Sequence, residues 1–471
     1  MAEKNDVLIA TVEGLGTGGE GICKVDGTTY FVPYVLPGEK ISFKVLKIKD
    51  RIGYGKVEEI YIPSNDRVEE KCPVFSRCGG CQLQHLTYEK QLEWKAGVVA
   101  EALKKIGHID FPVPKAVASD LPYGYRNKLQ MPVGVDKEGN TVIGFYAERS
   151  HRIVATEDCA IHPVWAKTLI AILRQYIFEC GVQGYDETKK TGTLRHIVVR
   201  ELDGKFIVTL VSAKSNLPRI ERFCQLLDEA FKEYTLWLNI NNSDTNVIFG
   251  EKFTLIKGNG FFDAEEKGIL YQAGPQTFVQ VNGNVRAKLY DAAIDLACEN
   301  GSEVMIDAYS GGGLMTAMLA KRAKRVYGIE LEKEAVACAD ALKKRNNLEN
   351  MTNICGKVEE KIFSVLEKEK NEKLGLILDP PRAGIHRSVL EALKKSGIPR
   401  LVLISCNPAT LARDLGILTG FLKDENGVLV KGEGNGEYEI ESIQPYDMFP
   451  QTKHVETLVC LSHKNLTDIS A

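Results

Sequence analysis

The sequence predicts an α/β protein whose C-terminal part is a mostly parallel, doubly wound sheet. From residue 276 onward, short apolar stretches alternate regularly with helical ones, as in sheets built from strand–helix–strand units. Residues 1–62 contain short strand-like stretches punctuated by Gly and Pro, and residues 63–275 mix strand-like and helical patterns. We therefore expect three domains with these boundaries: a small β-barrel, a central α+β domain and an α/β domain at residues 276–471.

The N-terminal domain is expected to be a five-stranded barrel of the OB type. Asp26-Gly27 lies between two of its strand-like stretches and is typical of a two-residue hairpin turn. Several short strands at this spacing favour such a barrel, a shape that often binds oligonucleotides. The expected strands are 7–12, 22–25, 28–32, 40–48 and 54–62.

Cations and tyrosines are interleaved near one end of this barrel. The group is either an ordinary solvated face or a surface where phosphates bind and bases stack. The sequence leaves both interpretations open. The residues are Lys40, Lys44, Lys47, Lys49, Arg51 and Lys56, with Tyr30, Tyr34 and Tyr54.

Composition and charge limit the function classes. The chain has 471 residues, of which 44% are hydrophobic and 26% charged, as in ordinary globular proteins. No apolar run approaches the roughly 20 residues that span a bilayer, and the N-terminus has no signal-peptide pattern. We expect a cytoplasmic protein without membrane contact or an obligate protein partner. With a net charge of −3, any nucleic-acid surface must be a local patch.

The C-terminal domain is expected to bind its ligand where its strands end. In doubly wound sheets the ligand crevice lies outside the carboxyl ends of the parallel strands. Residues that directly follow a strand are therefore the candidates for chemistry. The expected strands are 303–307, 325–330, 351–355, 374–379, 400–405, 437–443 and 455–462.

A glycine-rich loop follows the first of these strands. Tyr309 precedes Ser310 and three glycines that include Gly311 and Gly313, and glycines let a backbone approach a ligand closely. Glu330 ends the next strand, 17 residues after Gly313, near the spacing at which an acid binds a ribose hydroxyl. The pattern favours a nucleotide or adenosyl site over a purely structural turn. The loop has neither the G-x-G-x-x-G motif of dinucleotide sites nor the lysine of the Walker motif, so dinucleotides and nucleoside triphosphates are disfavoured as ligands.

Two further strands end in reactive side chains. Asp379 ends the fourth strand, before Pro380 and Pro381, and Cys406 follows the fifth strand, before Asn407-Pro408. A lone cysteine is more often a small core residue. Because Cys406 should lie on the same sheet edge as the glycine loop and Asp379, we interpret it as a candidate nucleophile.

An acidic residue begins the last strand. Glu456 is embedded in the otherwise apolar stretch 455–461, where an unpaired carboxylate would be costly to bury. Either it ends a strand at the surface, or it lies in a site that raises its pKa, as a general base requires. We favour the second interpretation.

The central domain begins with a group of cysteines and a helix expected over residues 88–106. Cys72, Cys78 and Cys81 lie close together in the sequence, and Cys159 is distant. Without a secretion signal, twelve cysteines favour metal binding or thiol chemistry over disulfides. Four thiolates suit either tetrahedral zinc or an iron–sulfur cluster, and their spacing does not separate these alternatives.

In these motifs, the chain resembles the RNA (uracil-C5)-methyltransferase family. It is most similar to the iron–sulfur-containing branch that acts on 23S ribosomal RNA and carries an N-terminal TRAM domain. The resemblance covers nearly the whole chain. Its motifs are CPVFSRCGGCQLQH, EDCAIHP, FVQVN, DAYSGGG, GIE, DPPR, SCNP and PYDMFPQTKHVE.

The resemblance implies a function and a role for each motif. It implies S-adenosylmethionine-dependent methylation of uridine carbon 5, with Cys406 as nucleophile and Glu456 as the base that removes the carbon-5 proton. It places Gln280, Tyr309, Glu330, Asp379, Gly311 and Gly313 around S-adenosylmethionine, and Phe278 and Asp379 beside the uracil. Cys72, Cys78, Cys81 and Cys159 would hold a [4Fe–4S] cluster with a structural or RNA-folding role.

Two other functions compete with this one. The same chemistry on tRNA is disfavoured because the tRNA branch of the family is expected to lack the barrel and the cysteine cluster. A non-catalytic iron–sulfur RNA-binding protein is disfavoured because Cys406, Glu456, Asp379 and the glycine loop are all present. We therefore expect 23S ribosomal RNA as the partner.

Overall fold

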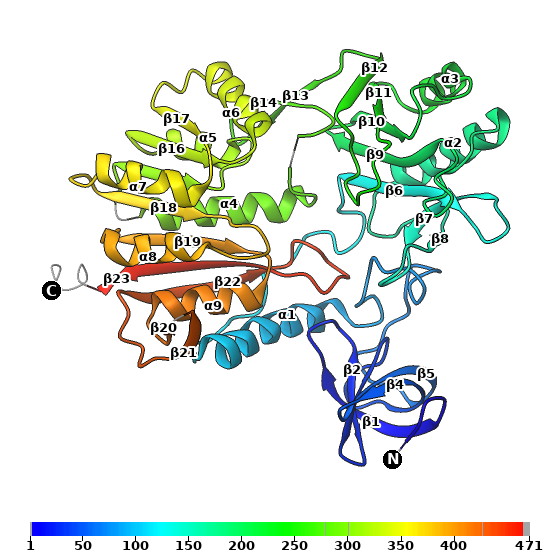
Figure 1. Ribbon diagram of the computed structural model, residues 1–471, viewed down its shortest axis with the longest axis horizontal. Helices are drawn as coiled ribbons and strands as arrows, with labels where there is room; N and C mark the ends of the chain where they lie inside the picture. Colours follow the sequence, from blue (N-terminus) through cyan, green and yellow to red (C-terminus); the bar gives the residue numbers. More distant parts are fainter. Residues whose placement is uncertain (1, 278, 300, 426, 465–471) are drawn as a thin grey trace. The chain divides into compact units, whose positions relative to one another are not determined.

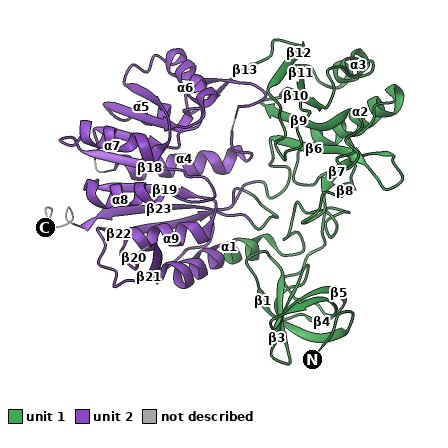
Figure 2. Cartoon of the chain, viewed as in Figure 1, with its two compact units in different colours: residues 1–94, 121–261, 449–453 green, residues 95–120, 262–448, 454–471 purple. Residues whose placement is uncertain are grey.

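The chain forms two compact units, which are coloured separately in Figure 2. The computed structural model describes residues 2–277, 279–299, 301–425 and 427–464. Unit 1 comprises the described residues of 1–94, 121–261 and 449–453, and unit 2 those of 95–120, 262–448 and 454–471. The short segment 449–453 therefore folds with unit 1, although the chain on both sides of it belongs to unit 2.

The N-terminal residues form the predicted closed, five-stranded barrel (Figure 1). Its strands run in the order β1-β2-β3-β5-β4, and Tyr30, Ile41 and Phe43 are fully buried inside it. Asp26 and Gly27 have φ values of 48° and 74°, as a type I′ hairpin turn requires. The strands are β1 Val7–Leu15, β2 Gly21–Val25, β3 Thr28–Val32, β4 Lys40–Lys49 and β5 Ile52–Ile62.

The rest of unit 1 is built on a seven-stranded sheet of order β12-β11-β10-β9-β6-β7-β8. Two helices, α2 Val164–Cys180 and α3 Ile220–Ala230, contribute side chains to the same core as the strands. A hairpin turn at Asp203-Gly204 joins β9 to β10. The strands are β6 Lys128–Val135, β7 Thr141–Tyr146, β8 Ile153–Ala155, β9 Leu194–Leu202, β10 Lys205–Ser212, β11 Tyr234–Ile240 and β12 Lys252–Lys257.

The helix expected over residues 88–106 is present, but its last turn differs from the expectation. The α-helix α1 spans Tyr88–Ala102, and a π-helical turn, Leu103–Gly107, continues it. Residues 88–94 of this helix belong to unit 1 and its remaining residues to unit 2.

Unit 2 contains the predicted doubly wound sheet, with strand order β17-β16-β15-β18-β19-β23-β22. The first five strands are parallel, whereas β23 is antiparallel to both β19 and β22. The strands are β15 Val304–Ala308, β16 Arg325–Glu330, β17 Met351–Cys355, β18 Leu374–Leu378, β19 Arg400–Ser405, β22 Tyr438–Tyr446 and β23 Glu456–His463.

Helices cover both faces of this sheet, which explains its continuously apolar strands. Every residue of β15, β18, β19 and β23 is buried. The covering helices are α4 Gly283–Cys298, α5 Leu314–Ala320, α6 Lys333–Arg345, α7 Val358–Lys368, α8 Arg387–Ser396 and α9 Pro408–Leu418. Pro408 is the first residue of α9, a position that proline favours.

Two short hairpins of unit 2 were not predicted. They are β13 Phe262–Glu266 with β14 Ile269–Ala273, and β20 Leu422–Glu425 with β21 Val428–Lys431. Most of their residues are exposed or only half-buried, so their sequences lack a strong apolar alternation. In the part of the chain that the structure describes, no helix is both long and apolar enough to cross a membrane.

Candidate active site

The predicted site residues of unit 2 gather at one edge of its sheet. The strand pairs Ala308↔Ile329 and Ala308↔Leu378 bring the ends of β15, β16 and β18 level with one another. Tyr309, Glu330 and Asp379 therefore lie at neighbouring strand ends, and Cys406 follows the end of β19. Because parallel strands share one carboxyl edge, residues far apart in the sequence face the same crevice.

The glycine loop after β15 leaves its backbone accessible. The N–H of Gly311 donates to a carboxylate oxygen of Glu330 over 2.8 Å, so the acid of the second strand fixes the loop of the first. A Cβ atom at Gly311 or Gly312 would meet no heavy atom within 4 Å. Open space beside a glycine backbone is what a closely bound adenosyl group requires.

Tyr309 has a conformation that the sequence does not indicate. Its φ is +69°, a value that is rare for a bulky residue and strains the backbone. The N–H groups of Tyr309 and Ser310 both donate to the carbonyl of Ile329, over 2.9 and 3.0 Å. These bonds hold the tyrosine in the strained conformation at the start of the loop, and strain of this kind is common at ligand-binding sites.

Asp307 is a buried residue of β15, and the half-buried Asp379 follows β18. The hydroxyl of Thr316 donates to Asp307 over 2.6 Å, and burial raises the pKa of Asp307 to about 6. Burial, and then the charge of Asp307, raise the pKa of Asp379 to about 7. The sequence analysis assigned no role to Asp307, because a buried aspartate inside an apolar strand is recognisable only from its surroundings.

Cys406 and Glu456 lie next to each other although 50 residues separate them in the sequence. Strands β19 and β23 are antiparallel, and their last pair at this end is Ser405↔Thr457. The following residue on one strand is Cys406, and the preceding residue on the other is Glu456. The Glu456 side chain is buried, with 4% of the residue exposed, whereas Cys406 is half-buried.

The charge of Glu456 affects the titration of the Cys406 thiol. Burial, followed by the charge of Asp379, raises the pKa of Glu456 to about 8. Burial and the charge of Glu456 also raise the pKa of the Cys406 thiol. The guanidinium of Arg382 acts in the opposite direction on both groups. This arrangement provides a thiol, a carboxyl group that can accept a proton near neutral pH, and a cation that favours the thiolate.

Arg382 and Asn407 fix the loops around the thiol. The side chain of Asn407 donates to the backbone carbonyl of Arg382 over 3.0 Å and accepts from the N–H of Ala409 over 3.1 Å. It thus joins the loop after β18 to the loop after β19 and caps helix α9. The sequence analysis quoted both residues within motifs without assigning them roles, because their contacts are between loops.

Gln280 and Phe278 precede helix α4. Gln280 is half-buried and lies two residues before Asn282, whose side chain caps α4 and donates to Ser119 over 3.0 Å. Phe278 lies outside the described residues. The predicted roles of both in cofactor or base binding stay predictions.

The four predicted metal ligands lie together in unit 1. Burial, and then the charges of Cys81, Cys72 and Cys78, raise the pKa of Cys159, so all four sulfur atoms act on one another. All twelve cysteines of the chain are free thiols. Among the described residues, however, no three His, Cys, Asp or Glu side chains surround a single ion position.

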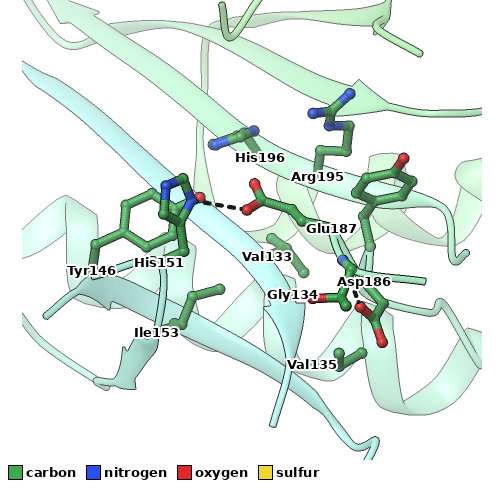
Figure 3. A pocket seen from close by; sticks show the side chains of 12 residues that line it. Val133, Gly134, Val135, Tyr146, His151, Ile153, Asp186, Glu187, Arg195 and His196 are labelled. Atoms are coloured by element: carbon green, nitrogen blue, oxygen red, sulfur yellow. Dashed lines mark hydrogen bonds and ion pairs between the residues drawn. The ribbon is translucent and has the colours of Figure 1, made fainter. Parts of the chain in front are cut away.

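Unit 1 also contains a cavity of about 130 Å³, shown in Figure 3. His151 and Glu187 are hydrogen-bonded at 2.9 Å on one side of it. On the other side, the Arg195 guanidinium lies 4.6 Å from the Tyr185 ring centre and donates to the carbonyl of Asn241 over 3.0 Å. Because Cys406 and Glu456 belong to unit 2, this cavity is not their site, and we assign it no catalytic role.

Comparison with known proteins establishes the family. The family described as tRNA (uracil-5-)-methyltransferase matches residues 87–464, and the TRAM domain matches residues 2–57. The chain belongs to the tRNA (uracil-5-)-methyltransferase family. Two of its relatives are described as uncharacterized RNA methyltransferases. The one from Halalkalibacterium halodurans is 38% identical over 98% of each chain. The one from Clostridium acetobutylicum is 37% identical over 98% of this chain and 97% of the relative.

A solved structure from this family shares the fold of nearly the whole chain. The Pyrococcus abyssi tRNA (uracil-54, C5)-methyltransferase, in complex with S-adenosyl-L-homocysteine, is 26% identical with a TM-score of 0.74. The match covers 96% of this chain and 99% of that one, so it extends over the barrel and the central region. The expectation that tRNA enzymes lack a counterpart of the barrel is therefore wrong, so the barrel does not exclude a tRNA substrate. The expectation that they lack the cysteine cluster stays a prediction.

For this RNA methyltransferase we expect kcat to rise as the pH increases from 6 to about 8. Glu456 accepts a proton only when deprotonated, and its raised pKa of about 8 leaves it mostly protonated below that pH. For a cysteine nucleophile, whose reactive form is the thiolate, the raised pKa of Cys406 acts in the same direction. Methyl-transfer assays at fixed ionic strength measure this profile. A rate that is constant or falls between pH 6 and 8 would contradict it.

Replacing Gly313 by alanine is expected to weaken S-adenosylmethionine binding by about tenfold, or about 1.4 kcal/mol. The φ of Gly313 is +81°, and an added Cβ would lie 2.7 Å from the Cβ of Ala339, so the loop must shift. Gly397→Ala is the matched control, because Gly397 has a φ of +63° but no heavy atom within 4 Å of an added Cβ. Calorimetric titration of both variants tests this. Equal affinities in the two variants would contradict the expected clash.

Proposed function

We propose that this enzyme uses S-adenosylmethionine to methylate carbon 5 of a uridine in structured RNA, through a covalent bond between Cys406 and carbon 6. The observation that carries the proposal is the position of Cys406 and Glu456, directly beyond the Ser405↔Thr457 pair. A nucleophile and a buried base at adjacent positions suit a reaction that adds to one carbon and removes a proton from its neighbour.

Cys406 makes the pyrimidine reactive. Carbon 5 of uracil is a poor nucleophile, and addition of the Cys406 thiolate to carbon 6 converts the ring into an enolate with electron density at carbon 5. The cation of Arg382 favours the thiolate that this step needs. The half-buried position of the sulfur leaves it accessible to a base.

The glycine loop would hold the cofactor. Glu330 would accept hydrogen bonds from the ribose, and the loop from Tyr309 through Gly311 to Gly313 would lie beside the adenosyl group. Gln280 and Asp379 would complete the site, and Phe278 with Asp379 would contact the uracil. The open space at Gly311 and Gly312 fits such a ligand, which when bound supplies the methyl group to carbon 5.

Glu456 completes the reaction. After methylation, its carboxylate removes the proton from carbon 5, the electron pair of that C–H bond re-forms the C5–C6 double bond, and the C6–S bond breaks to release the Cys406 thiolate. The raised pKa of about 8 makes Glu456 an effective proton acceptor near neutral pH. A conformational or unstacking change in the RNA must first expose the uridine, at a cost of a few kcal/mol.

The proposed RNA-binding region is the barrel of residues 1–62, the first of three functional domains. The second would span residues 63–275 and the third 276–471. A family match to the TRAM domain at residues 2–57 supports a role of the barrel in recognising RNA. The six cations between Lys40 and Lys56 would bind phosphates.

We propose 23S ribosomal RNA as the substrate, and tRNA is a second candidate. The likeness to the tRNA (uracil-54, C5)-methyltransferase over 96% of the chain favours the second. The two candidate substrates can be distinguished by mapping 5-methyluridine in ribosomal RNA and tRNA. The RNA is taken from a strain that lacks the gene and from the same strain carrying the gene on a plasmid. Loss of a 23S site supports the first candidate, and loss of a tRNA site supports the second. Unchanged 5-methyluridine in all RNA would contradict the proposed function.

The four gathered thiols are proposed to hold a [4Fe–4S] cluster. Four thiolates suit either one tetrahedral zinc ion or an iron–sulfur cluster, and the resemblance of CPVFSRCGGCQLQH and EDCAIHP to the cluster motif favours the cluster. A four-iron cluster is larger, and each sulfur binds a different iron atom. Cys159 would be the distant fourth ligand to the group formed by Cys72, Cys78 and Cys81.

Anaerobically purified protein is therefore expected to contain about four iron atoms per chain. Cys159→Ser should lose most of this iron, because it removes one of four ligands. Cys224→Ser, a half-buried cysteine of unit 1 outside the group, should keep it. Elemental analysis and visible absorption measure both. One zinc ion per chain, or equal iron in the two variants, would contradict the cluster.

A further inference from the structure

The cavity of unit 1 is built around an irregularity in the pairing of β9 with β10. Val211 of β10 opposes His196 of β9, but the next residue of β10 opposes Leu194. Arg195 is therefore an extra residue on β9, that is, a β-bulge. Successive residues of a regular strand point to opposite faces, whereas a bulge redirects side chains. Arg195 and His196 accordingly both line the cavity (Figure 3).

His196 brings a buried polar atom without a partner to this cavity. The residue is 8% exposed, and its Nδ1 has no hydrogen-bond partner. Burial, and then the charge of Arg195, lower the pKa of His196 to about 4, so its ring is neutral at physiological pH. Leaving a buried polar atom unpaired is costly. A ligand that bonds to this nitrogen would remove that cost.

The walls of the cavity suit a flat ring. The rings of Tyr146 and His151 lie with their centres 5.8 Å apart, and aliphatic atoms of Val133 and Ile153 line the cavity beside them. Its volume of about 130 Å³ is below the roughly 300 Å³ at which pockets enclose a whole drug-sized ligand. One heterocycle, stacked on an aromatic side chain as bases of single-stranded RNA are, fits this description.

Glu187 decides which heterocycle the cavity prefers. Its carboxylate only accepts hydrogen bonds, and its partner His151 has a side chain that is 70% exposed, so a ligand can replace this partner. Among the RNA bases, guanine alone presents two adjacent N–H donors, the ring N1–H and the 2-amino group, on its Watson–Crick edge. A carboxylate can accept from both. The carboxylates of Asp186 and Glu187 disfavour an anion in the same place.

Cations lie along the chain next to the lining residues. Arg149 and Arg152 flank His151, and Lys189 and Lys190 follow the lining segment 185–188. All four residues are exposed, and ion pairs at exposed positions are weak. These side chains can therefore exchange their protein partners for phosphates. Phosphates on both sides of a bound base are a property of an RNA strand and not of a free base.

We propose that this cavity binds one unstacked guanine of the RNA substrate, with Glu187 accepting hydrogen bonds from its Watson–Crick edge and His196 bonding to its ring. The guanine is a second recognition point, besides the uridine that is methylated. Every residue of this site belongs to unit 1. The inference goes beyond the proposed function and does not depend on Cys406 or Glu456.

The test measures binding of a single-stranded oligouridine with one central guanosine, by fluorescence anisotropy without S-adenosylmethionine. The same RNA with adenosine at that position is expected to bind about tenfold more weakly. Inosine, which lacks the 2-amino group, should give an intermediate affinity. Glu187→Gln should remove most of the preference for guanosine, because it replaces one acceptor oxygen by an N–H donor. Glu233→Gln is the matched control, since Glu233 is an exposed glutamate of unit 1 beside Lys205, and it should keep the preference.

A second measurement locates the bound base. With 6-thioguanosine at the central position, light should crosslink the RNA to the peptide that contains Tyr146 and His151. Equal affinities for the guanosine and adenosine RNAs would overturn the proposal, and so would an unchanged preference in Glu187→Gln or a crosslink only to other peptides. Guanosine monophosphate that binds as tightly as the guanosine RNA would assign the cavity to a free nucleotide and overturn the RNA site. Each of these failures leaves the proposed methylation untouched, because no methyl transfer is measured.

Discussion

Replacing Cys406 by alanine is expected to reduce uridine methylation by at least about 10⁴-fold. In the proposed reaction the Cys406 thiolate adds to carbon 6, and without that addition carbon 5 has too little electron density to accept a methyl group. Affinity for S-adenosylmethionine should change little, because Cys406 follows β19 whereas the glycine loop follows β15. Transfer of radiolabelled methyl groups to RNA, with calorimetry for the cofactor, measures both quantities.

Cys338→Ala provides the matched control for this variant. Cys338 is an exposed cysteine on α6 in the same unit, so its removal should leave methylation unchanged. If the Cys406 variant retains more than a few per cent of wild-type activity, Cys406 is not the nucleophile. If it loses cofactor affinity to the same extent as activity, its role is structural.

Replacing Glu456 by glutamine is expected to slow turnover by about 10²–10⁴-fold and to trap the enzyme on its RNA. Glutamine keeps the size and polarity of the side chain but cannot accept a proton at carbon 5. Addition of Cys406 and methylation then proceed, and the C6–S bond cannot break. A band of protein joined to RNA should therefore appear on denaturing gels.

Glu439→Gln is a suitable control, because Glu439 is an exposed glutamate on the neighbouring strand β22. It should turn over normally and show no band of joined protein and RNA. If Glu456→Gln methylates RNA slowly and forms no more adduct than the wild-type enzyme, Glu456 acts before the addition step. Such a result would assign proton removal to another group.

Much of the fold could be predicted because its signals are local. The barrel and the doubly wound sheet follow from apolar patterns and from hairpin turns such as Asp26-Gly27, whose conformation depends on two residues. The hairpins at 262–273 and 422–431 were missed because their strands are short and largely exposed. The π-helical end of α1 was also missed, since a helix pattern does not reveal how its last turn is wound.

The site was only partly predictable, since its geometry depends on contacts between distant residues. The sequence identified Cys406 and Glu456 as candidates, but the antiparallel β19–β23 pairing that brings them together has no local signal. The left-handed Tyr309 and the influence of Arg382 on both groups were not foreseen for the same reason. The ion pair between Lys95 and Asp447 spans 352 positions and could be found only in the folded chain.

The most direct measurement of the central claim is peptide mapping of the adduct formed by Glu456→Gln. After nuclease and protease digestion, mass spectrometry should find the nucleotide on the peptide that contains Cys406, with the added mass of a methylated uridine. The methyl group should be present because proton removal follows methylation. A nucleotide attached to any other residue, or no attached nucleotide at all, would contradict the account.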